Sequence, residues 1–125
     1  MGSTSEPNLL TQKIIGCCFA VHRQLGPGFN EKIYSNALQL TLKKERLSFF
    51  AEKEFIVMFD NVQVGKFRCD LFIEGSVIVE LKSVTGIMPK LFHNQLISYL
   101  KASKIKTGLL INFGNTSCDI KRLSV

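Results

Sequence analysis

Two neighbouring segments of the sequence alternate apolar and polar residues with a period of two, and this pattern most restricts how the chain can fold. They run from Val64 to Glu74 and from Val77 to Ser83. Every charged residue in both segments has an even number, and the odd-numbered residues from Phe67 to Leu81 are apolar, apart from the glycine between the segments. Because successive strand side chains point to opposite faces, each strand has an apolar face and a polar face.

The two strands share one apolar core only if the numbers of paired residues add up to an even number. A plain two-residue turn at Gly75-Ser76 gives an odd sum and turns the apolar face of one strand outward. We therefore predict a three-residue connection or a β-bulge between them, with Gly75 at positive φ. In that register the side chains of Asp70, Glu80 and Lys82 converge on one face.

Helical patterns precede and follow these strands. Apolar residues recur at three- and four-residue steps from Asn8 to Leu25, and Gly26-Pro27-Gly28 ends this run. Asn30 can cap a second helix, which fades near Arg46-Leu47, because its side chain accepts hydrogen bonds from the free amides of the first turn. A last helix is expected from Pro89 to about Ser103, since proline suits the first turn of a helix.

Shorter strand patterns complete the chain. Residues 54–59 are expected to form a strand that ends in a turn at Asp60-Asn61. Further strands are expected at residues 109–113 and, at an edge of the sheet, at residues 119–123. The predicted order is α-α-β-β-β-α-β(-β), which describes a mixed α/β fold.

Length and composition indicate a globular protein. The chain has 125 residues, of which 46% are hydrophobic and 21% charged, and such values exclude a disordered or collagen-like chain. We expect a flexible leader at residues 1–8 and one domain at residues 9–125. No apolar run is long enough to span a membrane, and no signal peptide opens the sequence. We therefore expect no association with membranes.

Charge and cysteine content suggest a partner and a location. The net charge of +6 favours an anionic partner such as nucleic acid. The four cysteines show no spacing that matches a zinc site, so we expect free thiols in a reducing compartment, cytoplasmic or nuclear. The cytoplasm is our prediction.

Asp70, Glu80 and Lys82 form a pattern that suits chemistry on phosphates. Two carboxylates on adjacent strands can bind Mg²⁺ or Mn²⁺, since these ions prefer oxygen ligands. Such an ion activates a water and neutralises charge on a phosphate, while a nearby ammonium helps to orient the water. Glu80 and Lys82 end a Val-Ile-Val run, where charges are avoided unless they are paired or used. The alternative is a solvated strand face whose charges form salt bridges.

These residues also resemble a known group of proteins. Asp70 followed by Glu80-Leu81-Lys82, then by a helix and an apolar strand, is similar to the motif of the PD-(D/E)XK nuclease superfamily. Gln95 to Tyr99 on that helix resembles the Q-x-x-x-Y motif of its RecB-like branch. The proline that often precedes the motif aspartate is replaced here by Cys69.

Two further segments are similar to a small family within that superfamily. Gly28 to Tyr34 reads G-x-x-E-x-x-Y, the signature of the GxxExxY family. Gly108 to Gly114, followed by Lys121-Arg122, resembles the rest of its pattern. The likeness extends from about Ile14 to Arg122, which is nearly the whole chain.

The resemblance implies a nuclease-like core, in which a mixed sheet is flanked by helices. Mg²⁺ or Mn²⁺ would be held by Asp70 and Glu80, and Lys82 would position the attacking water. Glu31 would reach in from the second helix as a further acid. Gln95 would contact the substrate or the water shell of the metal.

Three other residues are supporting candidates. Tyr34 and Tyr99 each share a helix face with an expected site residue, Glu31 and Gln95 respectively. Both tyrosines can equally be core residues with a hydroxyl at the rim, and an acid at the start of a helix also stabilises the helix dipole. His22 lies about one turn before the glycine-rich stop and is a secondary candidate.

Basic residues gather late in the sequence and are candidates for contacts with nucleic acid phosphates. They are Lys90, Lys101, Lys104, Lys106, Lys121 and Arg122. Such contacts would give salt-sensitive binding without sequence preference, whereas the alternative is an ordinary solvated surface.

Three functions remain open at this point. The first is a metal-dependent nuclease that acts on DNA, which we favour, or on RNA. The second is a catalytically silent module of the same fold that binds nucleic acid or a protein partner, and the third is a structural domain with an ion-pair network. So small a chain has little room for its own recognition surface, which a homodimer or a larger protein partner would supply.

Overall fold

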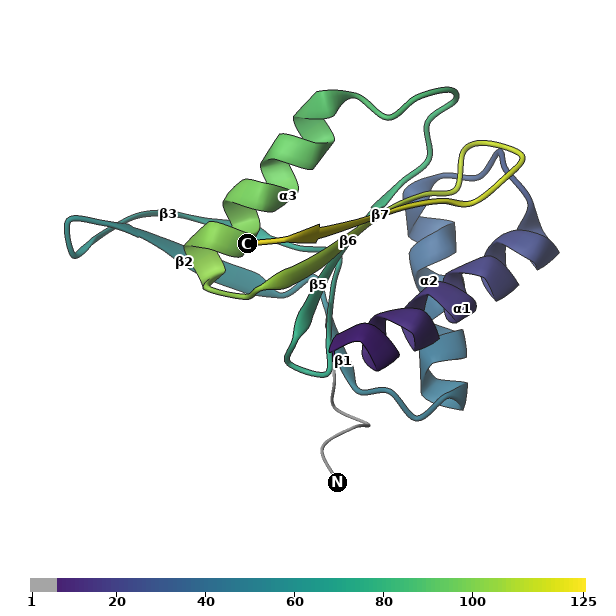
Figure 1. The fold of residues 1–125 in the computed structure, drawn as a ribbon, viewed down its shortest axis with the longest axis horizontal. Helices are drawn as coiled ribbons and strands as arrows, with labels where there is room; N and C mark the ends of the chain where they lie inside the picture. The colour runs from purple at the N-terminus through teal and green to yellow at the C-terminus, as the bar shows by residue number, and fades with distance from the viewer. Residues whose placement is uncertain (1–6) are drawn as a thin grey trace.

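The computed structural model describes residues 7–125. These residues fold into a sheet with helices on both of its faces (Figure 1). The helices are α1 (Pro7–Leu25), α2 (Glu31–Lys44) and α3 (Lys90–Ser103). The strands are β1 (Phe49–Ala51), β2 (Glu54–Phe59), β3 (Val62–Arg68), β4 (Leu71–Ile73), β5 (Val77–Lys82), β6 (Thr107–Asn112) and β7 (Asp119–Ser124). Most of the predicted leader, residues 1–6, lies outside the described part. Helix α1 begins one residue before the predicted start at Asn8.

The main sheet has the strand order β1-β4-β5-β6-β7. Strands β5 and β6 are parallel and are joined through α3, whereas the other neighbouring strands are antiparallel. A parallel pair needs such a crossover connection, because no short turn can join the two ends. Helices α1 and α2 cover one face and α3 covers the other (Figure 1). This arrangement confirms the predicted mixed α/β fold with flanking helices.

The connection between β4 and β5 confirms the predicted register. Leu71 pairs with Val79 and Ile73 pairs with Val77, so the connection has three residues. Gly75 has φ +61° and Glu74 has φ +54°, and the glycine adopts this left-handed conformation without steric cost. The odd-numbered residues of both strands consequently face the same helices.

The predicted long strand from Val64 to Glu74 is wrong, because the chain bends at Cys69 and Asp70. Strand β3 before the bend pairs with β2, and β4 after it belongs to the main sheet. Figure 1 shows β2 and β3 extending away from the main sheet. Cys69 therefore packs on the α3 side, rather than beside Leu71 as its odd number suggested.

The segment that pairs with β3 and β4, which contains β1 and β2, bends at the same place. Ala51 pairs with Leu71 before the bend and Glu54 pairs with Arg68 beyond it, so no residue is inserted on either side. Between these pairs the backbone N–H of Glu52 donates to Asp70 O at 2.9 Å. Strands β1 to β4 thus form one long hairpin, and the sequence pattern did not predict the three-residue β1.

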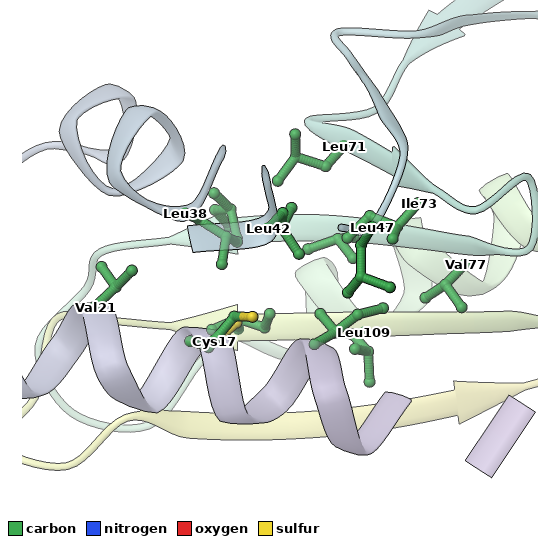
Figure 2. Packing of buried hydrophobic residues seen from close by; sticks show 14 of the residues in the cluster. Cys17, Val21, Leu38, Leu42, Leu47, Leu71, Ile73, Val77 and Leu109 are labelled. Carbon is green, nitrogen blue, oxygen red and sulfur yellow. The ribbon is translucent and has the colours of Figure 1, made fainter. Parts of the chain in front are cut away.

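The larger core lies between the sheet and helices α1 and α2 (Figure 2). Leu38 and Leu42 of α2 point toward Leu71 and Ile73 of β4, and Cys17 of α1 lies near the sheet. Each fully buried leucine or isoleucine contributes about 1.5–3 kcal/mol to folding. A smaller cluster under α3 contains Leu96, Leu100 and Leu110 among its members.

The helix ends match the chemistry of their sequences. Asn30 caps α2, and its side-chain oxygen accepts from the backbone N–H of Ile33 at 3.3 Å. Helix α3 begins at Lys90, one residue after the predicted start, with Pro89 at the N-cap. Within residues 7–125 no helix combines the length and the apolar character needed to cross a membrane.

Candidate active site

Asp70 and Glu80 lie side by side, and the carboxylate of each accepts a hydrogen bond from a backbone N–H in the other's segment of the chain. The N–H of Asp70 donates to Oε2 of Glu80 at 2.9 Å, and the N–H of Leu81 donates to Oδ2 of Asp70 at 2.7 Å. The bend places Asp70 just before β4, and the three-residue connection places Glu80 opposite it on β5. The second oxygen of each carboxylate accepts no hydrogen bond from the residues that the structure describes.

Burial makes both carboxyl groups of this pair weaker acids than usual. Glu80 is only 6% exposed. Its burial, and after it the charge of Asp70, raise the pKa of Glu80 from 4.5 to about 8. Burial also raises the pKa of Asp70, although the N–H of Leu81 and the charge of Lys82 counteract this rise. Glu80 consequently tends to hold a proton near neutral pH, and a bound cation would favour the ionised form.

Lys82 ends β5 next to these carboxylates. Lys82 stands two positions after Glu80 in β5, so their side chains share a face of the sheet. The charge of Lys82 lowers the pKa of both Asp70 and Glu80. The ammonium lies over the ring of Phe92, 4.2 Å from the ring centre, at the start of α3. In the described part of the chain Lys82 forms no ion pair with a carboxylate, so it is available to a water or a phosphate.

Glu31 approaches the pair from the first turn of α2. Its charge is one of the causes that raise the pKa of Glu80. Glu31 and Asp70 line a cavity of about 200 Å³, together with Lys32, Ser35, Gln39, Glu52 and Leu81. The sequence reading missed Glu52, because the residue stands outside every motif and reaches the site only through the bend.

Helix α3 brings Tyr99 near the carboxylates from the opposite side. Its ring stacks on Phe67 of β3 with the ring centres 4.0 Å apart. Burial raises the pKa of Tyr99, and the charges of Glu80 and Asp70 raise it further. Gln95 lies one turn earlier on α3, where it is exposed and makes no side-chain hydrogen bond to the described residues.

Tyr34 and His22 do not turn toward the carboxylates. The Tyr34 hydroxyl donates to Gly26 O at 2.5 Å and accepts from Phe29 N at 3.2 Å. Its buried ring stacks on Phe113. His22 Nε2 lies 2.8 Å from Asn115 O, a distance at which it can donate. Within the G-x-x-E-x-x-Y segment, therefore, the tyrosine holds the glycine-rich loop while Glu31 faces the cavity.

Two asparagines hold the loop that follows Lys82. The Asn112 side chain accepts from the N–H of Val84 and donates to its carbonyl, both at 2.9 Å. Asn115 pairs with Gly86 in the same way, at 2.8 Å in each direction. The sequence reading assigned no role to these residues, although a polar Asn112 in an otherwise apolar strand was a usable signal.

The predicted basic residues do not form one surface. Lys90 and Lys101 lie in the first and last turns of α3, about 15–20 Å apart for a helix of this length. Lys104 caps the same helix at its C-terminus. Lys90 and Lys121 line one cavity of about 940 Å³ at the start of α3, whereas Arg122 hydrogen-bonds Asn8 of α1.

The donor set suits a hard cation that keeps water ligands. Within residues 7–125 no three histidine, cysteine, aspartate or glutamate side chains are arranged to hold a metal ion together. Mg²⁺, however, is commonly held by one or two carboxylates together with waters and substrate phosphates. The free oxygens of Asp70 and Glu80 fit this mode, in which the protein contributes only part of the coordination.

The fold and the site define a nuclease-like protein, and comparison with known families agrees. The sequence pattern of the PD-(D/E)XK nuclease superfamily matches residues 8–123. The chain belongs to this superfamily. No curated protein sequence matches the chain at a significant level.

A solved structure supports the fold independently. The crystal structure of SSO0001 is similar with a TM-score of 0.59 and 22% sequence identity. The match covers 74% of this chain and 48% of that one, so this chain spans about half the length of its structural neighbour. At this identity the likeness concerns the fold alone.

Proposed function

We propose that the protein is a Mg²⁺-dependent nuclease, also able to use Mn²⁺, that hydrolyses phosphodiester bonds. Asp70 and Glu80 would be the metal ligands, and Lys82 would position the attacking water. The observation that carries this proposal is the pair of adjacent carboxylates, each with one oxygen free, beside an unpaired lysine. The Gly28–Tyr34 and Gln95–Tyr99 segments support placement in the GxxExxY family and the RecB-like branch.

The roles follow from the surroundings of each side chain. When bound, the cation would lower the pKa of a water and neutralise charge on the phosphate. Lys82 would orient that water and stabilise negative charge as it develops. Glu31 would act as a further acid at the cavity, and Gln95 would contact the substrate. Tyr99 would support Gln95 on α3, whereas Tyr34 and His22 would act indirectly through the loops that they hold.

We favour DNA over RNA as the substrate and the cytoplasm as the location. The net charge of +6 supports an anionic partner of either kind. Lys90, Lys101, Lys104, Lys121 and Arg122 are the proposed phosphate contacts. Since they are spread over both ends of α3 and over β7, contact with all of them requires an extended substrate or a second subunit.

A metal titration tests the proposal most directly. Calorimetry with Mg²⁺ and Mn²⁺ should show binding to the wild type and none to the Asp70→Ala/Glu80→Ala variant. The matched control is Glu54→Ala/Glu74→Ala, which removes two exposed carboxylates outside the site. Lys82→Ala should retain metal and nucleic acid but lose cleavage. Wild-type protein that binds no metal, alone or with a non-cleavable oligonucleotide, would argue against the nuclease.

The alternative is a catalytically silent module that binds nucleic acid or a protein partner. The raised pKa of Glu80 supports it, because protons compete with a cation for the pair at neutral pH. Exposed apolar residues on the β2–β3 hairpin, such as Phe59 and Val62, favour a protein partner or a homodimer. Glu80→Ala separates the two functions, since only an enzyme has cleavage to lose.

A further inference from the structure

Glu52 brings two positive side chains together at the edge of the candidate active site. Its carboxylate lies 3.6 Å from Nζ of Lys32 on α2 and 3.7 Å from an Nη atom of Arg68 on β3. These two residues are far apart in the sequence, and the shared carboxylate is the group that joins them. All three side chains are more than half exposed, so they are accessible to a ligand from solvent.

The backbone fixes this position. Glu52 has φ +55°, a conformation that costs energy for a residue other than glycine. Its N–H bonds to Asp70 O, and the next carbonyl, of Lys53, accepts from Cys69 N at 3.0 Å. Glu52 is therefore the bend residue that faces Asp70, and its side chain lines the same cavity as Glu31 and Asp70.

The negative charge of Glu52 opposes the binding of an anion at the cavity. Its charge is among the causes that raise the pKa of Asp70, so it adds to the negative charge that a phosphate would meet. It also forms ion pairs with Lys32, which lines the cavity, and with Arg68 of β3. The parallel N–H groups of an arginine guanidinium, together with a lysine ammonium, are suited to bind the oxygens of a phosphate. Without a competing carboxylate, Lys32 and Arg68 would be free to bind one.

We propose that Lys32 and Arg68 contact a phosphate of a DNA substrate next to the scissile one, and that Glu52 is their resident counter-ion. The incoming phosphate takes the place of the Glu52 carboxylate between the two cations. Glu52 therefore holds the affinity for DNA below the value that the two cations alone would give. This inference rests on the proposed function, because it places the scissile phosphate at Asp70 and Glu80.

Equilibrium binding of a fluorescein-labelled DNA oligonucleotide tests this inference, in EDTA so that no cleavage occurs. Glu52→Gln retains the backbone bond to Asp70 and removes the charge. We expect it to tighten binding about three- to fivefold, the effect of an exposed ion pair, and to steepen the dependence of affinity on salt. Lys32→Ala/Arg68→Ala should weaken binding and abolish the effect of Glu52→Gln.

Glu54→Gln is the matched control. Glu54 lies two residues away, pairs with Lys66 at 3.4 Å and is as exposed as Glu52, so its replacement changes the net charge by the same amount. We expect it to leave the dissociation constant within about twofold, because it does not face the cavity. Equal tightening by both variants would show a bulk charge effect and would overturn the inference.

Two other outcomes would also overturn it. These are unchanged or weaker binding by Glu52→Gln, and an effect of Glu52→Gln that persists without Lys32 and Arg68. Absence of DNA binding by every variant would overturn the inference, whereas the proposed nuclease would still be tested separately by the metal titration. Absence of cleavage in Mg²⁺, in a protein that shows the Glu52→Gln effect, would count against the nuclease and not against the two-cation contact.

Discussion

The backbone N–H of Asp70, just before β4, donates a 2.9 Å hydrogen bond to Oε2 of Glu80 on β5. This bond exists in only one register of the two strands, because a shift of one residue would turn Glu80 to the other face. The chemistry of the candidate site therefore depends on the three-residue connection at Gly75. Four predictions follow from the surroundings of this pair and of the loops beside it.

The stability of the protein should fall as the pH rises from about 5 to about 9, mainly because of Glu80. Its pKa is 4.5 as an ordinary side chain and about 8 in the fold. Between these values the folded state holds a proton that the unfolded chain has lost, so a higher pH favours unfolding. Melting temperatures of the wild type and of Glu54→Gln should decline over this range, and those of Glu80→Gln should decline less. An equally steep decline in Glu80→Gln would contradict the prediction.

Affinity for Mg²⁺ should increase with pH between about 6 and 8, approaching tenfold per unit where one proton is released. The cation requires both carboxylates in their ionised form, while burial favours the protonated form of Glu80. Calorimetry in buffers of different ionisation heat would count the released protons. The isosteric Asp70→Asn/Glu80→Gln variant should bind no Mg²⁺ at any pH in this range. An affinity that does not change with pH would rule out a site at this pair.

Tyr34→Phe should destabilise the fold by about 1–2 kcal/mol, because it removes the hydroxyl that bridges the glycine-rich loop. That hydroxyl bonds both Gly26 O and Phe29 N in a buried position, while the stacking of the ring on Phe113 is retained. Urea unfolding would measure the loss. Tyr99→Phe is the control, since the Tyr99 hydroxyl has no hydrogen-bond partner among the described residues. Equal stability of the two variants would mean that the loop contacts contribute little.

Gly114→Ala should destabilise the protein by about 2–3 kcal/mol and displace the loop after Lys82. A Cβ at residue 114 would collide with the backbone of Val84, which Asn112 holds in place. Gly108→Ala provides the contrast, because its Cβ would meet only the side chain of Leu96, at 3.1 Å. We expect less than half the loss for Gly108→Ala by urea unfolding. A larger loss for Gly108→Ala would show that the Val84 segment yields more easily than α3.

Sequence reasoning succeeded where the relevant pattern is local. The parity of the apolar residues around Gly75 predicted the register of β4 and β5, since the side-chain period of a strand is a property of the backbone alone. The N-cap at Asn30 and the start of α3 next to Pro89 are equally local. The adjacency of Asp70 and Glu80 followed from that register.

Sequence reasoning failed where the outcome depends on distant parts of the chain. The run from Val64 to Glu74 reads as one strand, but its partner is bent at Glu52, so the run is divided between two sheets. The sequence left a site role and a core role open for Tyr34, and the structure supports the core role, because its hydroxyl donates to Gly26 O. Among the late lysines, Lys90 and Lys121 line one cavity, whereas Lys101 and Lys104 stand at the other end of α3.

The sequence by itself determined the helices and most of the strands, the register at Gly75 and the identity of the carboxylate pair, because periodicity and turn chemistry act over a few residues. Only the tertiary structure decided that Asp70 stands at a bend and that Glu52 meets Lys32 and Arg68 beside it. Those positions depend on hydrogen bonds and ion pairs between residues that are distant in sequence, and no local pattern encodes which of them will meet.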